Sequence, residues 1–140
     1  IQLKKMSEWH SKRNINANRI WSVAKECNGL RVPDIPSYID HAAYKCYVFI
    51  EPEKLKKNCT RDWIIKEIKS LSVPCFLGSC SEIYLEKAFN DKSFKPPQRL
   101  PNAKMLGETS LMFLVHPTLT DDEIQQTCHA IQSVMQKAEK

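Results

Sequence analysis

The chain contains 140 residues, of which 42% are hydrophobic and 26% are charged, and its formal net charge is +5. A chain of this length and composition is normally one globular domain, and it contains no apolar run near the roughly 18 residues of a membrane span. The residues from Ile1 to Lys5 lack the pattern of a signal peptide, and the first residue is not methionine. We therefore expect a piece of a longer protein. The positive charge indicates either solvated loops and helix ends or a mild attraction for an anionic partner, and its sign alone does not choose between them.

The first 27 residues predict a long amphipathic helix that ends at Asn28-Gly29. Its apolar residues recur at helical spacing, namely Leu3, Met6, Trp9, Ala17, Ile20, Ala24 and Cys27. At about 1.5 Å per residue the helix would be roughly 40 Å long, about the width of the whole domain. Such a helix is long enough to connect this domain to a structure beyond Ile1.

The middle of the chain alternates between strand and helix patterns. The stretch from Leu30 to Asp40 contains two prolines and predicts an extended connector, and Ala43 to Ile50 alternates as a strand does. Thr60 can cap a helix from Arg61 to Leu71, and Cys75 to Leu77 has the length of a short second strand. These segments predict one strand before a helix and one strand after it.

Gly78 to Tyr84 is the stretch with the densest functional groups. Ser79 and Glu82 have the spacing of a capping box, which predicts a helix running through Phe89, and Asn90 to Arg99 predicts a polar, mobile loop. Small hydroxyls and backbone N–H groups at a helix start can bind an anion or a polar ligand, although simple capping explains them equally. The ligand-binding candidates in this stretch are Ser79, Cys80, Ser81, Glu82 and Tyr84.

The last third predicts a short helix, a buried strand and a long helix. Pro101 can open the short helix and Gly107 can close it, and Leu111 to Val115 is a continuous apolar strand that needs cover on both faces. Thr120 and Glu123 form a second capping box. The helix that follows has one apolar face, which we expect to pack on the strand: Ile124, Cys128, Ile131, Met135 and Ala138. The predicted fold class is α/β, a two-layer α+β sandwich with a small three-stranded sheet.

The cysteines and histidines do not have the spacing of a metal site, and the sequence has no Gly-rich phosphate loop and no hydrolase or protease motif. The six cysteines are an even number, but several lie on apolar faces, which favours reduced thiols in a cytoplasmic protein over disulfides or zinc. We predict no metal ligand and no catalytic residue in this chain.

Several segments resemble, in order and spacing, the DegT/DnrJ/StrS aminotransferases. The strongest similarity lies in Leu100 to Ala103 and in His116 to Thr120, and weaker similarity lies in Ile1 to Met6, His41 to Val48 and Thr60 to Asp62. The sequence departs from the family after the second strand. Many members have a His-Tyr pair and a further histidine there, whereas this chain has no histidine between positions 76 and 84.

The resemblance implies the small C-terminal domain of a fold-type I, pyridoxal-phosphate-dependent enzyme. Such an enzyme transfers an amino group, from glutamate, to a keto sugar carried on a nucleotide, works as a homodimer and binds neither nucleic acid nor membrane. It also implies that residues 1–29 lead out of a missing large domain, that residues 30–140 form the small domain, and that His41 lies near the substrate. The cofactor lysine belongs to the large domain, so this fragment should bind no cofactor and be inactive.

Two other classes of function remain open from the sequence. The chain could be a free-standing α/β module that binds a ligand or a protein without catalysis. It could also bind nucleic acid, given its net charge and its tryptophans Trp9, Trp21 and Trp63, although it contains no known nucleic-acid-binding motif.

Overall fold

The computed structural model describes residues 2–90 and 95–140. Its helices are α1 (Gln2–Glu26), α2 (Arg61–Ser70), α3 (Pro101–Thr109) and α4 (Asp121–Ala138), and its strands are β1 (Leu30–Arg31), β2 (Cys46–Ile50), β3 (Cys75–Phe76) and β4 (Ser110–Phe113). Short 3-10 turns lie at η1 (Pro52–Lys54), η2 (Ile83–Leu85) and η3 (Lys87–Phe89). The predicted α/β class is therefore confirmed.

The strands form one antiparallel sheet in the order β1-β2-β4-β3. Its central strand β4 is buried along its whole length, as its continuous apolar run predicts. The prediction of three strands was wrong, because Leu30 pairs with Ile50 and Arg31 with Phe49 at the start of the expected connector. Two residues are too few to show a strand period, so only the pairing with β2 reveals this fourth strand.

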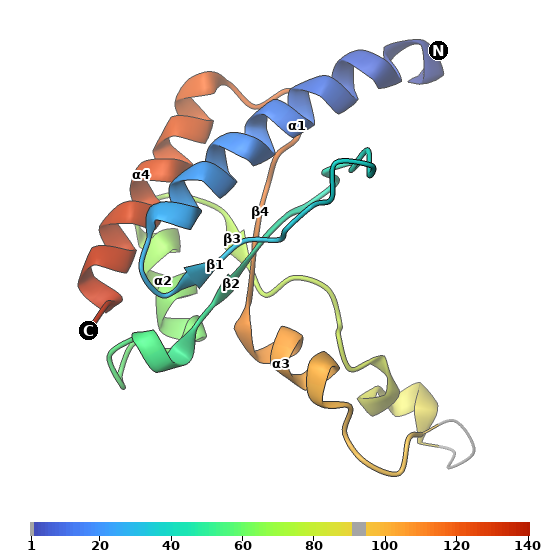
Figure 1. Cartoon of the computed structure of the whole chain (residues 1–140), viewed down its shortest axis with the longest axis vertical. Helices are drawn as coiled ribbons and strands as arrows, with labels where there is room; N and C mark the ends of the chain where they lie inside the picture. The colour runs from blue at the N-terminus through green and yellow to red at the C-terminus, as the bar shows by residue number, and fades with distance from the viewer. Residues whose placement is uncertain (1, 91–94) are drawn as a thin grey trace.

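Helices α1, α4 and α2 lie together on one side of the sheet, while α3, η2 and η3 extend away at the lower right (Figure 1). Strand β2 shows the consequence, because Cys46, Val48 and Ile50 are buried in the common core while Tyr47 and Phe49 are half-buried on the opposite face. Burying alternate residues against the helices leaves the other sheet face open to a partner or ligand.

Helix α4 has the predicted capping box and buried apolar face, but it packs mainly on α1 and α2 where we expected the strand over residues 111–115. Thr120 Oγ1 accepts from Glu123 N at 3.2 Å and Glu123 Oε2 accepts from Thr120 N at 2.7 Å, which closes the capping box. The predicted apolar face is buried in the same core as β4, and the helix packs between α1 and α2.

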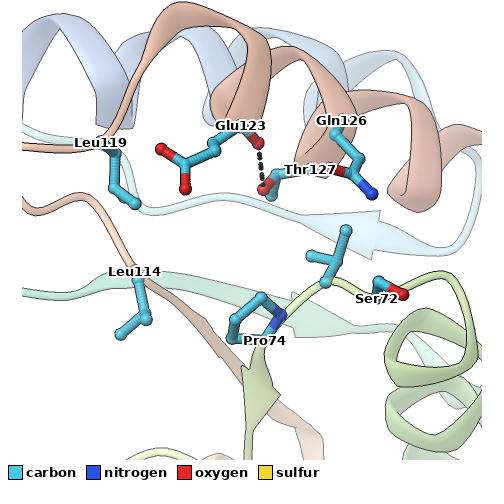
Figure 2. A pocket seen from close by; sticks show the side chains of 8 residues that line it. Ser72, Pro74, Leu114, Leu119, Glu123, Gln126 and Thr127 are labelled. Carbon is cyan, nitrogen blue, oxygen red and sulfur yellow. Dashed lines mark hydrogen bonds between the residues drawn. The ribbon is translucent and has the colours of Figure 1, made fainter.

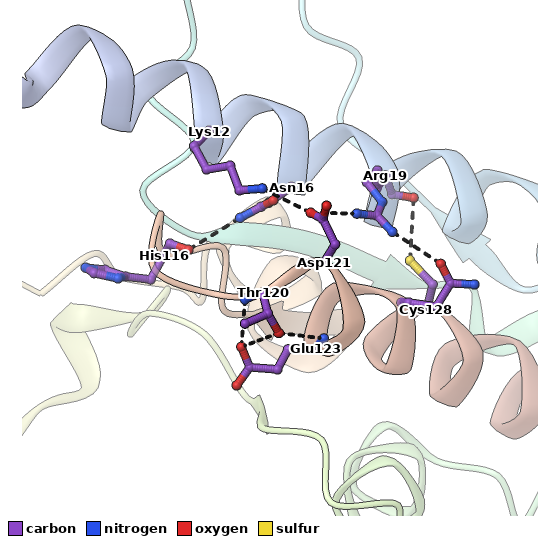
Figure 3. A network of polar contacts seen from close by, with 9 residues as sticks. Lys12, Asn16, Arg19, His116, Thr120, Asp121, Glu123 and Cys128 are labelled. Carbon is purple, nitrogen blue, oxygen red and sulfur yellow. Dashed lines mark hydrogen bonds and ion pairs between the residues drawn. The ribbon is translucent and has the colours of Figure 1, made fainter.

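Polar contacts fix α4 against α1 (Figure 3). Asp121 Oδ1 accepts from Lys12 Nζ at 3.0 Å and from Arg19 Nη1 at 3.2 Å. Asn16 is fully buried and donates to the His116 carbonyl at 3.3 Å. These contacts hold the second half of α1, whereas Leu3 and Met6 near its start are 80% and 58% exposed.

Two local predictions were wrong. The capping box at Ser79 opens no α-helix, and residues 83–89 form only the turns η2 and η3, because Glu82 bonds Arg99 instead of the backbone. Gly107 does not end α3, which continues to Thr109 and leads directly into β4. The polar loop predicted over residues 90–99 lies partly outside the described residues, and its mobility stays a prediction.

Within residues 2–90 and 95–140 no helix has the length and apolar character needed to cross a membrane. The same part of the chain contains no group of three or more His, Cys, Asp or Glu side chains placed to hold a metal ion. All six cysteines carry free thiols, and four of them are buried: Cys46, Cys59, Cys75 and Cys128.

Candidate functional site

The candidate site lies on the open face of the sheet, along one side of β2. Tyr47 and Phe49 share this face of β2, and Lys45, in the bend just before the strand, lines the same depression as Tyr47. Two shallow depressions adjoin this row of Lys45, Tyr47 and Phe49 and share Tyr47 and Ser79. One is lined by His41, Ala42, Ala43, Tyr44, Lys45, Tyr47 and Ser79, and the other by Tyr47, Phe49, Ser79, Ser81, Leu106 and Ser110.

The ridge between the two depressions is a hydrogen-bonded pair. The hydroxyls of Tyr47 and Ser79 are 2.6 Å apart, and the Tyr47 hydroxyl also accepts from Ser79 N at 3.1 Å. Gly78 makes this contact possible, because its φ is +93° and a Cβ there would lie 2.6 Å from Tyr47 Cε1. The chain therefore turns directly over the tyrosine ring.

The rest of this loop is fixed against β4 and α3. Ser110 Oγ donates to the Leu77 carbonyl at 2.6 Å. Ser81 lies so close to Gly107 that a Cβ on the glycine would come within 2.3 Å of Ser81 Oγ. Arg61 Nη1 donates to the Gly107 carbonyl, which links α3 to the start of α2. Ser79 and Ser81 are thus held in defined positions at the edge of the open face.

Glu82 and Tyr84 point instead into a cluster with Arg99. Glu82 Oε1 accepts from Arg99 Nε at 2.8 Å and from the Tyr84 hydroxyl at 2.7 Å, and Arg99 Nη2 donates to Glu82 Oε2. The Tyr84 hydroxyl in turn accepts from Leu100 N at 3.0 Å. The hydrogen bond from Arg99, and to a smaller extent that from Tyr84, lowers the pKa of Glu82 to about 2. This carboxylate is therefore ionised at neutral pH, and its oxygens are already hydrogen-bonded within the cluster.

Cys80 also has a local partner. Its thiol is exposed and donates to Glu86 Oε1 at 3.4 Å. This hydrogen bond is the main reason that the pKa of the Cys80 thiol is raised. A raised pKa lowers the thiolate fraction at neutral pH, which makes a nucleophilic role less favourable.

His41 lines the first depression and stabilises the chain that leads into β2. Its Nδ1 accepts from Ala43 N at 3.1 Å, where Ala43 has a φ of +44°, and its ring meets the Trp21 ring edge-on at 5.9 Å. The His41 carbonyl lies 3.0 Å from His10 Nε2, on α1. These contacts give His41 a clear structural role as well as a place beside the site.

The structure brings together three of the six predicted residues. His41, Ser79 and Ser81 line the two joined depressions, whereas Cys80, Glu82 and Tyr84 are engaged in contacts with their own loop. Sequence reasoning did not select Lys45, Tyr47 and Phe49, because their spacing of two places them on one side of a strand without telling which side the helices cover.

Another pocket is a weaker candidate for a ligand site, because its polar side chains are largely engaged in structural hydrogen bonds. A pocket between the start of α4 and the turn before β3 contains Glu123, Gln126 and Thr127 (Figure 2). Three of its polar side chains already have partners: Glu123 in the capping box, Gln126 Nε2 at 3.2 Å from the Leu71 carbonyl, and Thr127 Oγ1 at 2.9 Å from the Glu123 carbonyl. The pocket therefore has a structural explanation.

The fold is also found in solved aminotransferases. The aminotransferase from Psychrobacter cryohalolentis is 50% identical with a TM-score of 0.89, and the match covers 97% of this chain and 36% of that chain. DesV from S. venezuelae, solved in complex with a ketimine intermediate, is 17% identical with a TM-score of 0.81 over 95% of this chain and 33% of that chain.

The family follows from the sequence match. Residues 1–132 match the DegT/DnrJ/EryC1/StrS aminotransferase family, and the chain belongs to it. Uncharacterized protein MJ1066 from Methanocaldococcus jannaschii is 24% identical over 137 residues, covering 96% of this chain and 34% of that protein. The chain thus spans about a third of the length of these relatives.

Members of the family depend on pyridoxal phosphate, but the residues of this site do not suit that cofactor by themselves. The cofactor needs a lysine for its imine and a carboxylate for its pyridinium nitrogen. Lys45 lines the first depression, whose other lining residues include no Asp or Glu. We therefore assign no cofactor chemistry to these residues.

Proposed function

We propose that the chain is the C-terminal domain of a pyridoxal-phosphate-dependent aminotransferase that transfers an amino group from glutamate to a nucleotide-linked keto sugar. In this proposal residues 1–29 connect to a larger domain that supplies the cofactor lysine, and residues 30–140 form the small domain. The intact enzyme is a cytoplasmic homodimer that serves the synthesis of polysaccharide or related sugars.

The observation that carries the proposal is the 50% identity to a solved aminotransferase, matched over nearly all of this chain and a third of that one. The family match over residues 1–132 agrees with it. The open sheet face supports a substrate-proximal role for Ser79, Ser81 and His41, because these side chains line depressions instead of filling the core.

The proposal makes a direct prediction for the 140-residue chain, which should fold but form no imine with pyridoxal phosphate. Titration with the cofactor followed by borohydride reduction and mass spectrometry tests this. The control is the full-length enzyme, which should give a stoichiometric adduct and aminate a nucleotide-linked keto sugar with glutamate. A stoichiometric adduct at one lysine of the 140-residue chain would contradict the proposal that the larger domain supplies the cofactor lysine.

The upstream coding sequence separates this proposal from a free-standing module. An extension of the reading frame that encodes a cofactor lysine supports the aminotransferase, whereas a start codon just before Ile1 contradicts it.

A further inference from the structure

The two joined depressions differ in chemistry along the β2 row. Towards the start of β2 lies the cation Lys45, and the lining of that depression contains no carboxylate. Towards its end lie Phe49 and Leu106, which make the second depression mainly apolar. From Tyr47 to Phe49 the strand advances roughly 7 Å, at about 3.3 Å per residue, and Lys45 lies just before its first residue.

The ridge between the two ends has a free hydrogen-bond donor. Tyr47 and Ser79 carry two hydroxyl protons, and their mutual bond of 2.6 Å uses one of them. The second bond of the pair, from Ser79 N to the Tyr47 oxygen, uses the amide proton of Ser79 and neither hydroxyl proton. One hydroxyl proton is left at the surface, in the middle of the row.

Charged side chains lie near both ends of the row. Asp40 follows the turn before His41, and its Oδ1 lies 3.3 Å from His10 Nε2, so it has a partner on α1. At the other end the Arg31 guanidinium lies 4.5 Å from the Phe49 ring centroid and adds a second positive charge beside the apolar depression. A positively charged side chain thus lies near each end of the row, Lys45 at one and Arg31 at the other.

From this arrangement we infer that the row binds the nucleoside diphosphate half of the substrate. The base lies against Phe49 and Leu106, and the diphosphate lies across the ridge towards Lys45, where the free hydroxyl proton of the Tyr47–Ser79 pair donates to a phosphate oxygen. This inference rests on the proposed function, and it makes Lys45, Tyr47 and Phe49 residues that select nucleotide-linked sugars over free ones.

The test is a titration of the chain with UDP, uridine and inorganic pyrophosphate, followed by amide chemical shifts. UDP should shift the amides of Lys45, Phe49 and Ser79, and it should bind more tightly than uridine or pyrophosphate. Lys45→Gln should weaken UDP about tenfold or more, the size expected for one charge-assisted hydrogen bond, and should leave uridine unchanged. Leu106→Ser should weaken UDP and uridine alike, since Leu106 is a wall of the apolar end and is 37% exposed.

Lys57→Gln is the matched control, because it removes the same charge from an exposed lysine outside both depressions. The inference would be overturned if both lysine variants lost UDP affinity equally, or if the shifts centred on residues 54–57. It would also be overturned if pyrophosphate bound as tightly as UDP, or if millimolar UDP gave no saturable shifts. If full-length Lys45→Gln aminates the nucleotide-linked sugar with an unchanged KM for that sugar, this inference is wrong but the proposed function stands. UDP binding at the row by an enzyme that aminates no keto sugar defeats the proposed function instead.

Discussion

Single acidic side chains in this domain are used to fix local structure. Glu82 holds Arg99 and Tyr84, and Glu123 completes the capping box of α4. In both cases hydrogen bonds lower the pKa of the carboxyl group, from Arg99 for Glu82 and from the Thr120 backbone for Glu123. A lowered pKa in the folded state stabilises the fold above the ordinary pKa of the group, and the effect is lost as the pH falls through the folded value.

For Glu82 the pH window runs from the ordinary value of 4.5 down to about 2. Leu100 N reports on the cluster because it donates to the Tyr84 hydroxyl at 3.0 Å. We expect the exchange protection of the Leu100 amide to fall across this window and to be already low at neutral pH in Glu82→Gln. The neighbouring Glu86→Gln is the control, since the Glu86 carboxylate accepts from the Cys80 thiol and, among the described residues, from neither Arg99 nor Tyr84. Unchanged Leu100 protection in Glu82→Gln would show that Arg99 and Tyr84 hold the loop without Glu82.

Thr120→Ala tests the capping box. The substitution removes the acceptor for Glu123 N and should lower the free energy of unfolding by about 1 kcal/mol, the usual cost of losing an N-cap. Urea unfolding measures it. Ser133→Ala in the same helix is the comparison, because it removes a hydroxyl away from the cap. Equal effects from both substitutions would contradict a role for the cap.

At the scale of elements, the loop after β3 depends on its glycine. Gly78→Ala must place a side chain at a φ of +93° and 2.6 Å from the Tyr47 ring. The left-handed backbone alone costs about 1–2 kcal/mol, and the ring contact adds to it. We expect lower stability in urea and loss of the Tyr47–Ser79 contact, seen as a shift of the Ser79 amide.

Gly107→Ala is the matched substitution in α3. An alanine there gains roughly 0.5–1 kcal/mol of helix stability and meets Ser81 Oγ, a short side chain that can rotate. The net change should therefore be smaller than for Gly78→Ala. If Gly107→Ala were the more damaging of the two, Ser81 would have to be fixed more firmly than Tyr47.

The elements predicted correctly are those whose pattern extends over many consecutive residues and depends on near neighbours in the sequence. Helix α4 combines a capping box with a regular apolar face, and β4 is a continuous apolar run. Strand β1 was missed because its two residues are defined by pairing with β2, and the helix expected at Ser79 was wrong because Arg99, seventeen residues away, binds Glu82. Contacts between distant residues decide such short segments.

The same distinction explains the candidate site. Ser79 and Ser81 could be predicted, because hydroxyls next to a glycine turn stand out in a sequence. Tyr47 and Phe49 could not be distinguished from core residues, since nothing local tells which face of an alternating strand the helices will cover. The pairing of Tyr47 with Ser79 joins residues 32 positions apart and is visible only in three dimensions.

At the scale of the whole molecule, two surfaces are only partly covered by the described residues of this domain. One is the open sheet face with the Lys45, Tyr47 and Phe49 row, on the side away from α1, α4 and α2. The other is the start of α1, which projects past the rest of the domain in Figure 1. Because the chain spans a third of its relatives, both surfaces are suited to contact the remainder of a longer protein.

The start of α1 gives the last prediction. Leu3 and Met6 are 80% and 58% exposed, whereas Ile20 and Ala24 on the same helix are fully buried. Apolar patches of about a few hundred Å² seldom remain open to water, so this turn should either fray or pair with a second copy. Hydrogen exchange over a concentration series tests this. The amides of Leu3 and Met6 should be poorly protected in dilute monomer and should gain protection only with dimer formation, while Ile20 and Ala24, the internal controls, stay protected throughout. Strong protection of Leu3 and Met6 in a strict monomer would mean that the domain stabilises its own first turns, and the exposed start of α1 would then no longer support a missing partner.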